Sequence, residues 1–568
     1  MQTMLDGLAG RLGWTPRASA ATALVALVPA ALILAPVVAV MVNLFATSPN
    51  FAHLARWVLP GYAWNTALLA AGTTAGVALL GVPAAWLVAM CRFPGRRFFE
   101  WAMILPLAIP AYVLAYAYTD FLQHSGPVQS ALRALLDLGP RDYWFPNIRS
   151  LPGAIVVFTL VLYPYVYLIA RTAFLEQSAC ALEVARTLGA GPWRAFWRVS
   201  LPLARPAIAA GIALVLMETF ADLGTVAHFG VQTFTTGIDR AWRSLGDRVL
   251  ASQLSSMLLL VALALLALER WNRGRARVHH TTGRYQRLPV HELKGARAGL
   301  AILGCAVPVV FGFALPAGLL VHLGATSGVP FVSPRYIELT ANSVTLAGLA
   351  AALAVALALA MAYAVRLGGG PLARAATRVA ALGYAIPGSI IAVGILVPLA
   401  GLDNAVDAFA RDTFGVSTGL LLTGSIAALV YAYLVRFMAV SLQTVEAGLD
   451  KVTPSMDAAA RTLGADLWRS LARVHAPMLR GTLLTAALIV FVDVMKELPA
   501  TLIMRPFNFD TLAVQAYRLA SDERLSEAAI PSLALVLVGL VPVILLSRAI
   551  MEARPGGNAA EAGTLALP

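Results

Sequence analysis

Residues 185–190, Ala-Arg-Thr-Leu-Gly-Ala, occur a second time as residues 460–465, 275 positions later (460 − 185). The same offset relates other residues on both sides of this stretch. The further pairs are Trp193/Trp468, Arg194/Arg469, Arg198/Arg473, Pro202/Pro477, Glu218/Asp493 and Asp222/Glu497, while Asn65/Asn342 and Pro110/Pro387 match at an offset of 277. Matches at a nearly constant offset over so long a stretch do not arise by chance, so the sequence is a tandem duplication.

The composition of the chain is that of a membrane protein. Of its 568 residues, 59% are hydrophobic and 12% are charged, about half the charge of soluble domains, which is roughly 25%. Apolar runs of about 20 residues recur along the whole length. We expect an all-α polytopic membrane protein with about 12 transmembrane helices, arranged as two parallel six-helix repeats. The expected spans are 20–45, 62–90, 99–119, 151–172, 203–226, 250–268, 298–322, 341–365, 377–400, 418–440, 481–504 and 528–548.

The net charge of +13 has two possible explanations, nucleic-acid binding and the positive-inside rule. The arginines favour the second, because they cluster between apolar segments on one side of the predicted membrane. Arg11 and Arg17 precede the first apolar run, which is too long for a signal-peptide core, so we expect an uncleaved span. These features predict a multi-pass membrane protein with both termini in the cytoplasm.

The duplication divides the chain into three parts. Residues 1–268 form the first half, 269–297 a basic cytoplasmic linker, and 298–568 the second half. Six spans in each half give both halves the same orientation, with a substrate path expected where they meet. The linker could bind anionic lipid, but we favour a solvated segment that fixes the topology.

The most repeated stretch is not in the predicted membrane. It is the loop after the fourth span, about 176–202, and its counterpart at about 450–477. Each is expected to contain a helix, a glycine turn and a second short helix, which in the first loop covers 192–199, before a proline enters the next span. An interfacial helix resting on lipid is one explanation. Two equivalent copies favour a partner with two equivalent grooves.

Both loops resemble the EAA loop of permeases of binding-protein-dependent ABC importers. The similarity rests on Glu183-Val184-Ala185, Gly189 and Leu201-Pro202, and on Ala458-Ala459-Ala460, Gly464 and Ala476-Pro477. In that family the loop seats in a cleft of the cytoplasmic ATPase. The resemblance implies ATPase-docking roles for Glu183, Ala185, Gly189, Trp193, Arg194, Ala458, Ala460, Gly464, Trp468 and Arg469. The second loop departs from the pattern, because Ala458 replaces the glutamate and Asp457 lies one position early.

The chain has no Gly-x-x-x-x-Gly-Lys-Ser/Thr sequence for binding ATP. The resemblance therefore implies a permease of the bacterial inner membrane without an enzymatic activity or cofactor of its own. Its partners would be a cytoplasmic ABC ATPase dimer, which uses ATP and Mg²⁺, and a periplasmic substrate-binding protein.

Residues 221–237 and 495–512 look like the corresponding stretches of fused permeases in ferric-iron importers. Thiamine importers share the duplicated plan, and phosphonate-type importers are more distant. The family likeness therefore leads to iron(III) as the expected substrate, moved by alternating access, with thiamine or phosphonate as alternatives. A secondary transporter and a membrane enzyme are opposed by the paired loops and by the lack of a catalytic cluster.

Charged residues are expected in or at the outer ends of spans 5 and 11. They are Glu218, Asp222, Asp493, Lys496 and Glu497. Carboxylates at such depth could line the translocation path, and iron(III) prefers oxygen ligands. The alternative is that Lys496 pairs with a neighbouring acid while the others cap helices or brace the periplasmic gate, and pairing is the commoner outcome. No catalytic residue or metal site is assigned from the sequence.

Overall fold

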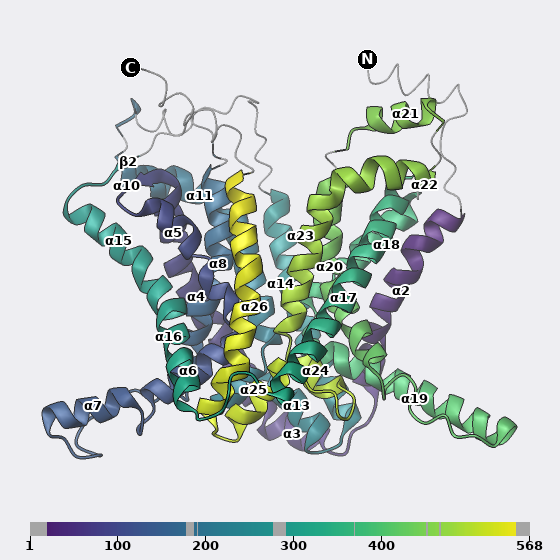
Figure 1. Cartoon of the computed structure of the whole chain (residues 1–568), viewed down its shortest axis with the longest axis horizontal. Coiled ribbons are helices and arrows are strands. Elements are labelled where there is room, and N and C mark those ends of the chain that lie inside the picture. The colour runs from purple at the N-terminus through teal and green to yellow at the C-terminus, as the bar shows by residue number, and fades with distance from the viewer. Residues whose placement is uncertain are drawn as a thin grey trace. The chain divides into compact units, whose positions relative to one another are not determined.

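The computed structural model describes residues 20–175, 177, 187–189, 191–275, 291–367, 370–449, 452–464 and 467–552. These residues are overwhelmingly α-helical (Figure 1), which confirms the predicted fold class. Eleven of the described helices are long and apolar enough to cross a membrane. A bent pair, 96–108 and 111–136, raises the number to twelve if it counts as one span.

The elements of the first repeat follow one another in the order of the predicted spans. They are α2 (Ala20–Val42), η1 (Asn43–Phe45), α3 (Phe51–Trp57), α4 (Leu59–Met90), β1 (Cys91–Arg92), α5 (Arg96–Ala102), η2 (Leu105–Ala108), α6 (Ala111–Leu122), α7 (Pro127–Leu136), α8 (Leu151–Leu175), α10 (Pro192–Ala195), η3 (Phe196–Ser200), α11 (Leu201–Ala221), α12 (Gly224–His228), α13 (Phe234–Arg243) and α14 (Arg248–Arg275).

The second repeat has the same order from its long second span onward. Its elements are β2 (His291–Glu292), α15 (Ala296–Val309), η4 (Val310–Ala314), α16 (Leu315–Thr326), α17 (Pro334–Arg366), α18 (Gly370–Ala380), η5 (Gly383–Ala385), α19 (Gly388–Phe414), α20 (Ile426–Leu449), α21 (Pro454–Thr462), α22 (Leu467–Ser470), η6 (Leu471–His475), α23 (Ala476–Met495), α24 (Pro499–Met504), α25 (Leu512–Ser521) and α26 (Leu525–Glu552).

The third span of each half was expected to be continuous, over 99–119 and 377–400. In both halves it is broken at a proline instead. In the first half Ile109 is extended and α6 begins directly after Pro110, with a bend of 90°. In the second half Ile386 is extended and α19 begins directly after Pro387. Proline lacks the amide that would continue the preceding helix, so it starts a new helix instead.

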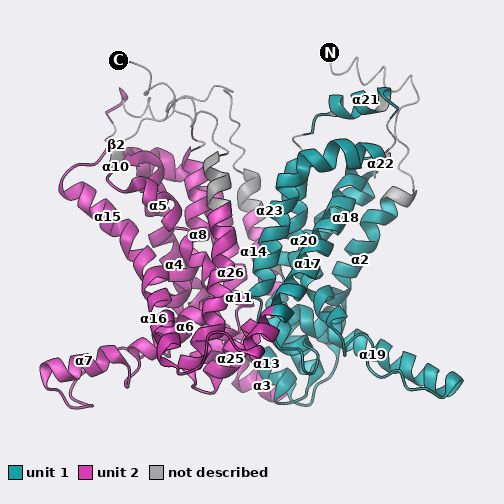
Figure 2. Ribbon diagram, in the orientation of Figure 1, with its two compact units in different colours: residues 1–51, 238–259, 341–510 teal, residues 52–237, 260–340, 511–568 magenta. Residues whose placement is uncertain are grey.

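The chain packs into two compact units (Figure 2), and these do not coincide with the two sequence halves. Unit 1 holds residues 1–51, 238–259 and 341–510, and unit 2 holds 52–237, 260–340 and 511–568. Each unit is therefore the middle of one half completed by terminal spans of the other. In unit 1, α2 packs on α18 and α19, whereas in unit 2 α16 packs on α26.

The core of unit 2 is built on close approach between α4 and α8. A Cβ on Gly76 would lie 2.2 Å from Oγ1 of Thr159, and one on Gly81 would lie 3.0 Å from the carbonyl oxygen of Tyr163. Small residues let membrane helices pack backbone to backbone. This contact fixes the end of α4 beside the end of α8, where the first loop begins.

The segment between the halves is more structured than predicted. The span expected at 250–268 matches the apolar part of α14, 248–269, and the helix continues to Arg275 because polar and charged residues extend it without a break. Within the predicted linker 269–297, β2 pairs in parallel with β1, Cys91 opposite His291. The remainder, 276–290, lies outside the described residues.

Candidate functional site

The first loop enters the membrane without the break predicted at Pro202. In the part described, α10, the π-helical turn η3 and α11 follow one another directly. Proline is tolerated here because it occupies the second position of α11 and the wider π turn precedes it. The short helix predicted at 192–199 is thus the first part of the fifth span.

Aromatic packing holds this end of the first loop. Phe196 is buried, and its ring centroid lies 5.2 Å from that of Trp86 on α4 and 6.3 Å from that of Phe174 on α8. Trp193 stacks on Phe196 but is itself exposed, as are Trp197 and Arg194. Of the other predicted docking residues of this loop, Glu183 and Ala185 lie outside the described residues.

The second loop contains a helix of its own, α21, before the glycine. Ala458 on this helix is exposed, while Ala460 is buried. Arg469 is exposed on α22, and the side chain of Trp468 lies outside the described residues.

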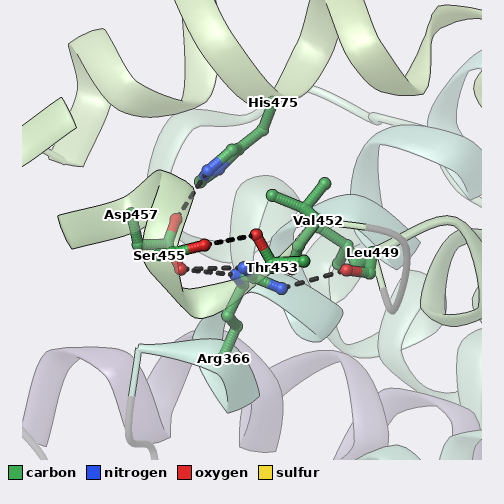
Figure 3. Close-up of polar contacts among 7 residues, drawn as sticks. All are labelled: Arg366, Leu449, Val452, Thr453, Ser455, Asp457 and His475. Carbon is green, nitrogen blue, oxygen red and sulfur yellow. Dashed lines mark hydrogen bonds and ion pairs between the residues drawn. The ribbon is translucent and has the colours of Figure 1, made fainter. Parts of the chain in front are cut away.

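Polar contacts, rather than aromatic ones, hold α21 (Figure 3). The Arg366 guanidinium at the end of α17 donates to Oδ2 of Asp457 from Nη2 at 2.8 Å and from Nε at 3.1 Å. The other carboxylate oxygen of Asp457 lies 2.7 Å from Nε2 of His475, the last residue of η6. Asp457 therefore points into its own unit, and it does not replace the missing glutamate as an outward charge.

Both loops present the same exposed residue at the glycine turn. Gly189 and Gly464 have positive φ angles, and the preceding residues, Leu188 and Leu463, are 81% and 88% exposed. An isolated large apolar side chain on a turn is available to a protein partner. Sequence reasoning did not single out these leucines, although their identity at equivalent positions of the repeat was a usable signal.

Two acids at the ends of α11 and α23, half-buried Asp222 and buried Glu497, cap short helices. Asp222 accepts hydrogen bonds from the amide of Thr225 at 2.7 Å and from its hydroxyl at 3.1 Å, at the start of α12. Glu497 accepts from the amides of Ala500 and Thr501, at 3.0 and 3.1 Å, at the start of α24. These are the same role at equivalent positions, and they follow the capping alternative.

Two of the remaining predicted path residues, Lys496 and Asp493, pair with each other at 2.9 Å, and Glu218 is half-buried on α11. Glu497 has an additional neighbour that the sequence did not reveal, since Nη1 of buried Arg436 on α20 lies 3.8 Å from its Oε1. In the described ranges, no three His, Cys, Asp or Glu side chains converge as metal ligands. Lining of a path by these residues stays a prediction.

A family model for the inner membrane component of binding-protein-dependent transport systems matches the chain twice, at residues 78–277 and 354–553. The two matches cover both loops and both sets of acids near the ends of α11 and α23.

Among known proteins, the chain is similar to an Fe(3+)-transport system permease protein of Haemophilus influenzae, with 26% identity over 85% of this chain and 89% of the relative. It is also similar to a probable ABC transporter permease protein of Sinorhizobium fredii, with 23% identity over 79% of this chain and 80% of the relative. The molybdenum transport system permease protein of Escherichia coli is 28% identical over 29% of this chain and 71% of its own length. The chain belongs to the binding-protein-dependent inner membrane components, and it is a fused, two-copy permease of an ABC importer.

Proposed function

We propose that this permease carries iron(III), received from a periplasmic binding protein, into the cytoplasm. One observation carries the choice of substrate. The similarity to a ferric permease extends over 85% of this chain and 89% of that relative, and thus over both fused halves. The similarities to permeases for molybdenum, sulfate and 2-aminoethylphosphonate extend over 26–30% of this chain.

The two loops are the proposed docking sites for the ATPase dimer. Gly189 and Gly464 give both loops the same turn, and each turn exposes a leucine. Docking would bury these leucines in equivalent clefts of the two ATPase subunits. Because the loops continue into α11 and α23, nucleotide-driven movement of the ATPase would reach the spans. Both termini are placed in the cytoplasm by this proposal.

Anion import is the alternative that a specific observation favours. Arg436 is buried in the middle of α20, and its Nε and Nη1 have no hydrogen-bond partner in the described part of the chain. A buried guanidinium is suited to oxyanions such as phosphonate. Glu497 lies beside Arg436 and balances its charge, so the pair does not by itself favour an anion over iron(III) as the substrate.

The test is substrate-stimulated ATP hydrolysis by the reconstituted complex. Purified permease and ATPase subunits in proteoliposomes are given binding protein loaded with iron(III), with 2-aminoethylphosphonate or with thiamine. We expect stimulation by the iron-loaded form and uptake of radioactive iron in proportion. Stimulation by one of the other loaded forms alone would overturn the iron assignment while leaving the importer intact.

A further inference from the structure

We propose that Arg366, Asp457 and His475 form a polar joint that positions the second loop and couples its movement to three membrane-spanning helices. This inference rests on the proposed docking of the loop to an ATPase. It goes further by assigning the step between docking and helix movement to named residues, and by making the two loops mechanically different.

Arg366 is the centre of the polar joint. As the last residue of α17, it donates through Nη1 to the carbonyl oxygen of Leu449 at 3.0 Å, at the end of α20. Through Nη2 it donates to the carbonyl oxygen of Val452 at 2.8 Å and to Asp457 on α21, also at 2.8 Å. One guanidinium thus holds two spans and the helix of the loop (Figure 3).

Asp457 extends the connection to a third span. While one carboxylate oxygen accepts from Arg366, the other lies 2.7 Å from Nε2 of His475, which directly precedes α23. The His475 ring is almost completely buried and packs edge-to-face on Tyr363, one turn before Arg366 on α17. The carboxylate of Asp457 therefore accepts hydrogen bonds at one oxygen and has the His475 ring within ion-pair distance of the other.

The first loop has no such joint in its sequence. The positions equivalent to Arg366, at offsets of 275 to 277, are Ala89, Met90 and Cys91. Leu182 corresponds to Asp457, and Ser200 corresponds to His475. Trp86, which corresponds to Tyr363, instead packs against Phe196. In the described residues, the first loop is attached by aromatic packing and by one neutral hydrogen bond, from Nε2 of Gln177 to the carbonyl oxygen of Ser200 at 2.7 Å. The second loop is attached by charge-assisted bonds to Asp457.

The difference in chemistry sets a difference in mechanics. Aromatic pairs accept both stacked and edge-to-face geometries and so tolerate sliding better than hydrogen bonds, which weaken steeply when their angle falls below about 120°. A displacement of α21 that preserves the bonds of Arg366 must carry the ends of α17, α20 and α23 with it. Loss of the polar joint should therefore leave docking of the ATPase in place and weaken the coupling between loop movement and the movement of the spans.

The experiment measures transport per ATP hydrolysed in proteoliposomes that contain the permease, ATPase subunits and iron-loaded binding protein. For Asp457→Asn, we expect co-purification of the ATPase and thermal stability close to wild type. The ratio of iron transported to ATP hydrolysed should fall about fivefold or more, the lower end of coupling between sites. Asp457→Glu should recover most of the ratio, since it restores both pairings.

Arg149→Gln is the matched control, because it removes another arginine–carboxylate pair, to Glu523, outside the spans. We expect an unchanged ratio. Should Asp457→Asn fail to accumulate, Arg366→Lys answers the same question, since lysine keeps the charge but cannot reach both carbonyls and the carboxylate at once.

The outcomes separate the two proposals. A wild-type ratio in Asp457→Asn and Arg366→Lys overturns the polar joint and leaves the importer standing. Loss of ATPase binding in stable variants also overturns it, since these residues would then belong to the docking surface. A wild-type permease that binds no ATPase overturns the proposed function itself.

Discussion

Gly189 and Gly464, which are 275 positions apart (464 − 189), have the same left-handed backbone conformation, with φ of +78° in each. The two halves therefore share not only the glycine but also the backbone conformation that turns each loop. Among the described residues, none lies within 4 Å of the position a Cβ would occupy on either glycine, so the requirement for glycine is conformational.

We predict that Gly464→Val weakens docking of the ATPase, whereas Gly464→Asn is largely tolerated. Left-handed backbone costs roughly 1–2 kcal/mol for residues with a side chain, and asparagine visits it more readily. Co-purification of the ATPase measures the effect. Gly481→Ala, in the interior of α23 with open space around it, is the control and should bind normally. Equal binding by Gly464→Val would contradict a role for the turn.

Replacement of Gly388 by alanine should destabilise unit 1. The new Cβ would lie 2.4 Å from Oε1 of Glu497 and 2.7 Å from Nη1 of Arg436. Overpacking costs about 1–3 kcal/mol, and here it also separates two buried charges. Thermal unfolding in detergent should show a lower Tm. Gly401→Ala on the same helix meets nothing within 4 Å, and a similar loss of stability in that variant would refute the explanation.

The Arg149–Glu523 pair predicts a pH-dependent stability difference. The Arg149 guanidinium donates to both carboxylate oxygens of Glu523 at 2.6 Å and holds the pKa of that carboxyl below its usual value. A depressed carboxyl pKa stabilises the fold above the unfolded-state pKa, and the contribution disappears as the pH falls through the folded-state value.

Glu523→Gln should therefore cost less than about 1 kcal/mol at pH 7, because the pair is partly exposed. The difference between variant and wild type should shrink as the pH falls below the ordinary range of a glutamate. Unfolding midpoints measured at several pH values test this. A difference that grows toward acid would show that the sign is wrong.

Cys91 should resist alkylation in the folded protein. It is buried at the start of β1, and burial raises the pKa of its thiol to about 11. The thiolate is the reactive form, so a shift from about 9 to about 11 slows labelling at neutral pH roughly a hundredfold. Peptide-level mass spectrometry after maleimide treatment, compared with detergent-unfolded protein, measures the rate. Equal labelling in both states would contradict the burial of this thiol.

The sequence was a reliable guide to what the duplication repeats. The number and order of the spans and the two glycine turns follow from apolar runs and matched residues, and the structure has them, although the third spans are broken and the fifth spans begin earlier than expected. Pro110 and Pro387 mark the broken third spans in the sequence. That the chain turns there and starts a new helix, rather than bending one continuous helix, depends on tertiary packing. The capping roles of Asp222 and Glu497 also needed structure, because each depends on the chain turning within three residues.

The residues missed were those without a counterpart in the other half. Arg366, Arg436 and His475 are charged or polar where the first half has aliphatic or small residues, so a comparison of repeats for likeness passes over them. Their partners lie far away in sequence, as with Arg366 and Asp457, which are 91 positions apart. Listing such differences between repeats would have identified both buried clusters.

The exchange of terminal spans between the two compact units has a consequence for biosynthesis. Helix α2 finds its neighbours α18 and α19 only after residues up to Phe414 have been made. At roughly 5–20 residues per second, the ribosome takes tens of seconds to add the intervening chain. During that time the first span must wait in the bilayer beside other partners or lipid. Neither unit can be completed early, so a truncated first half should be a substrate for membrane quality control rather than a stable half-permease.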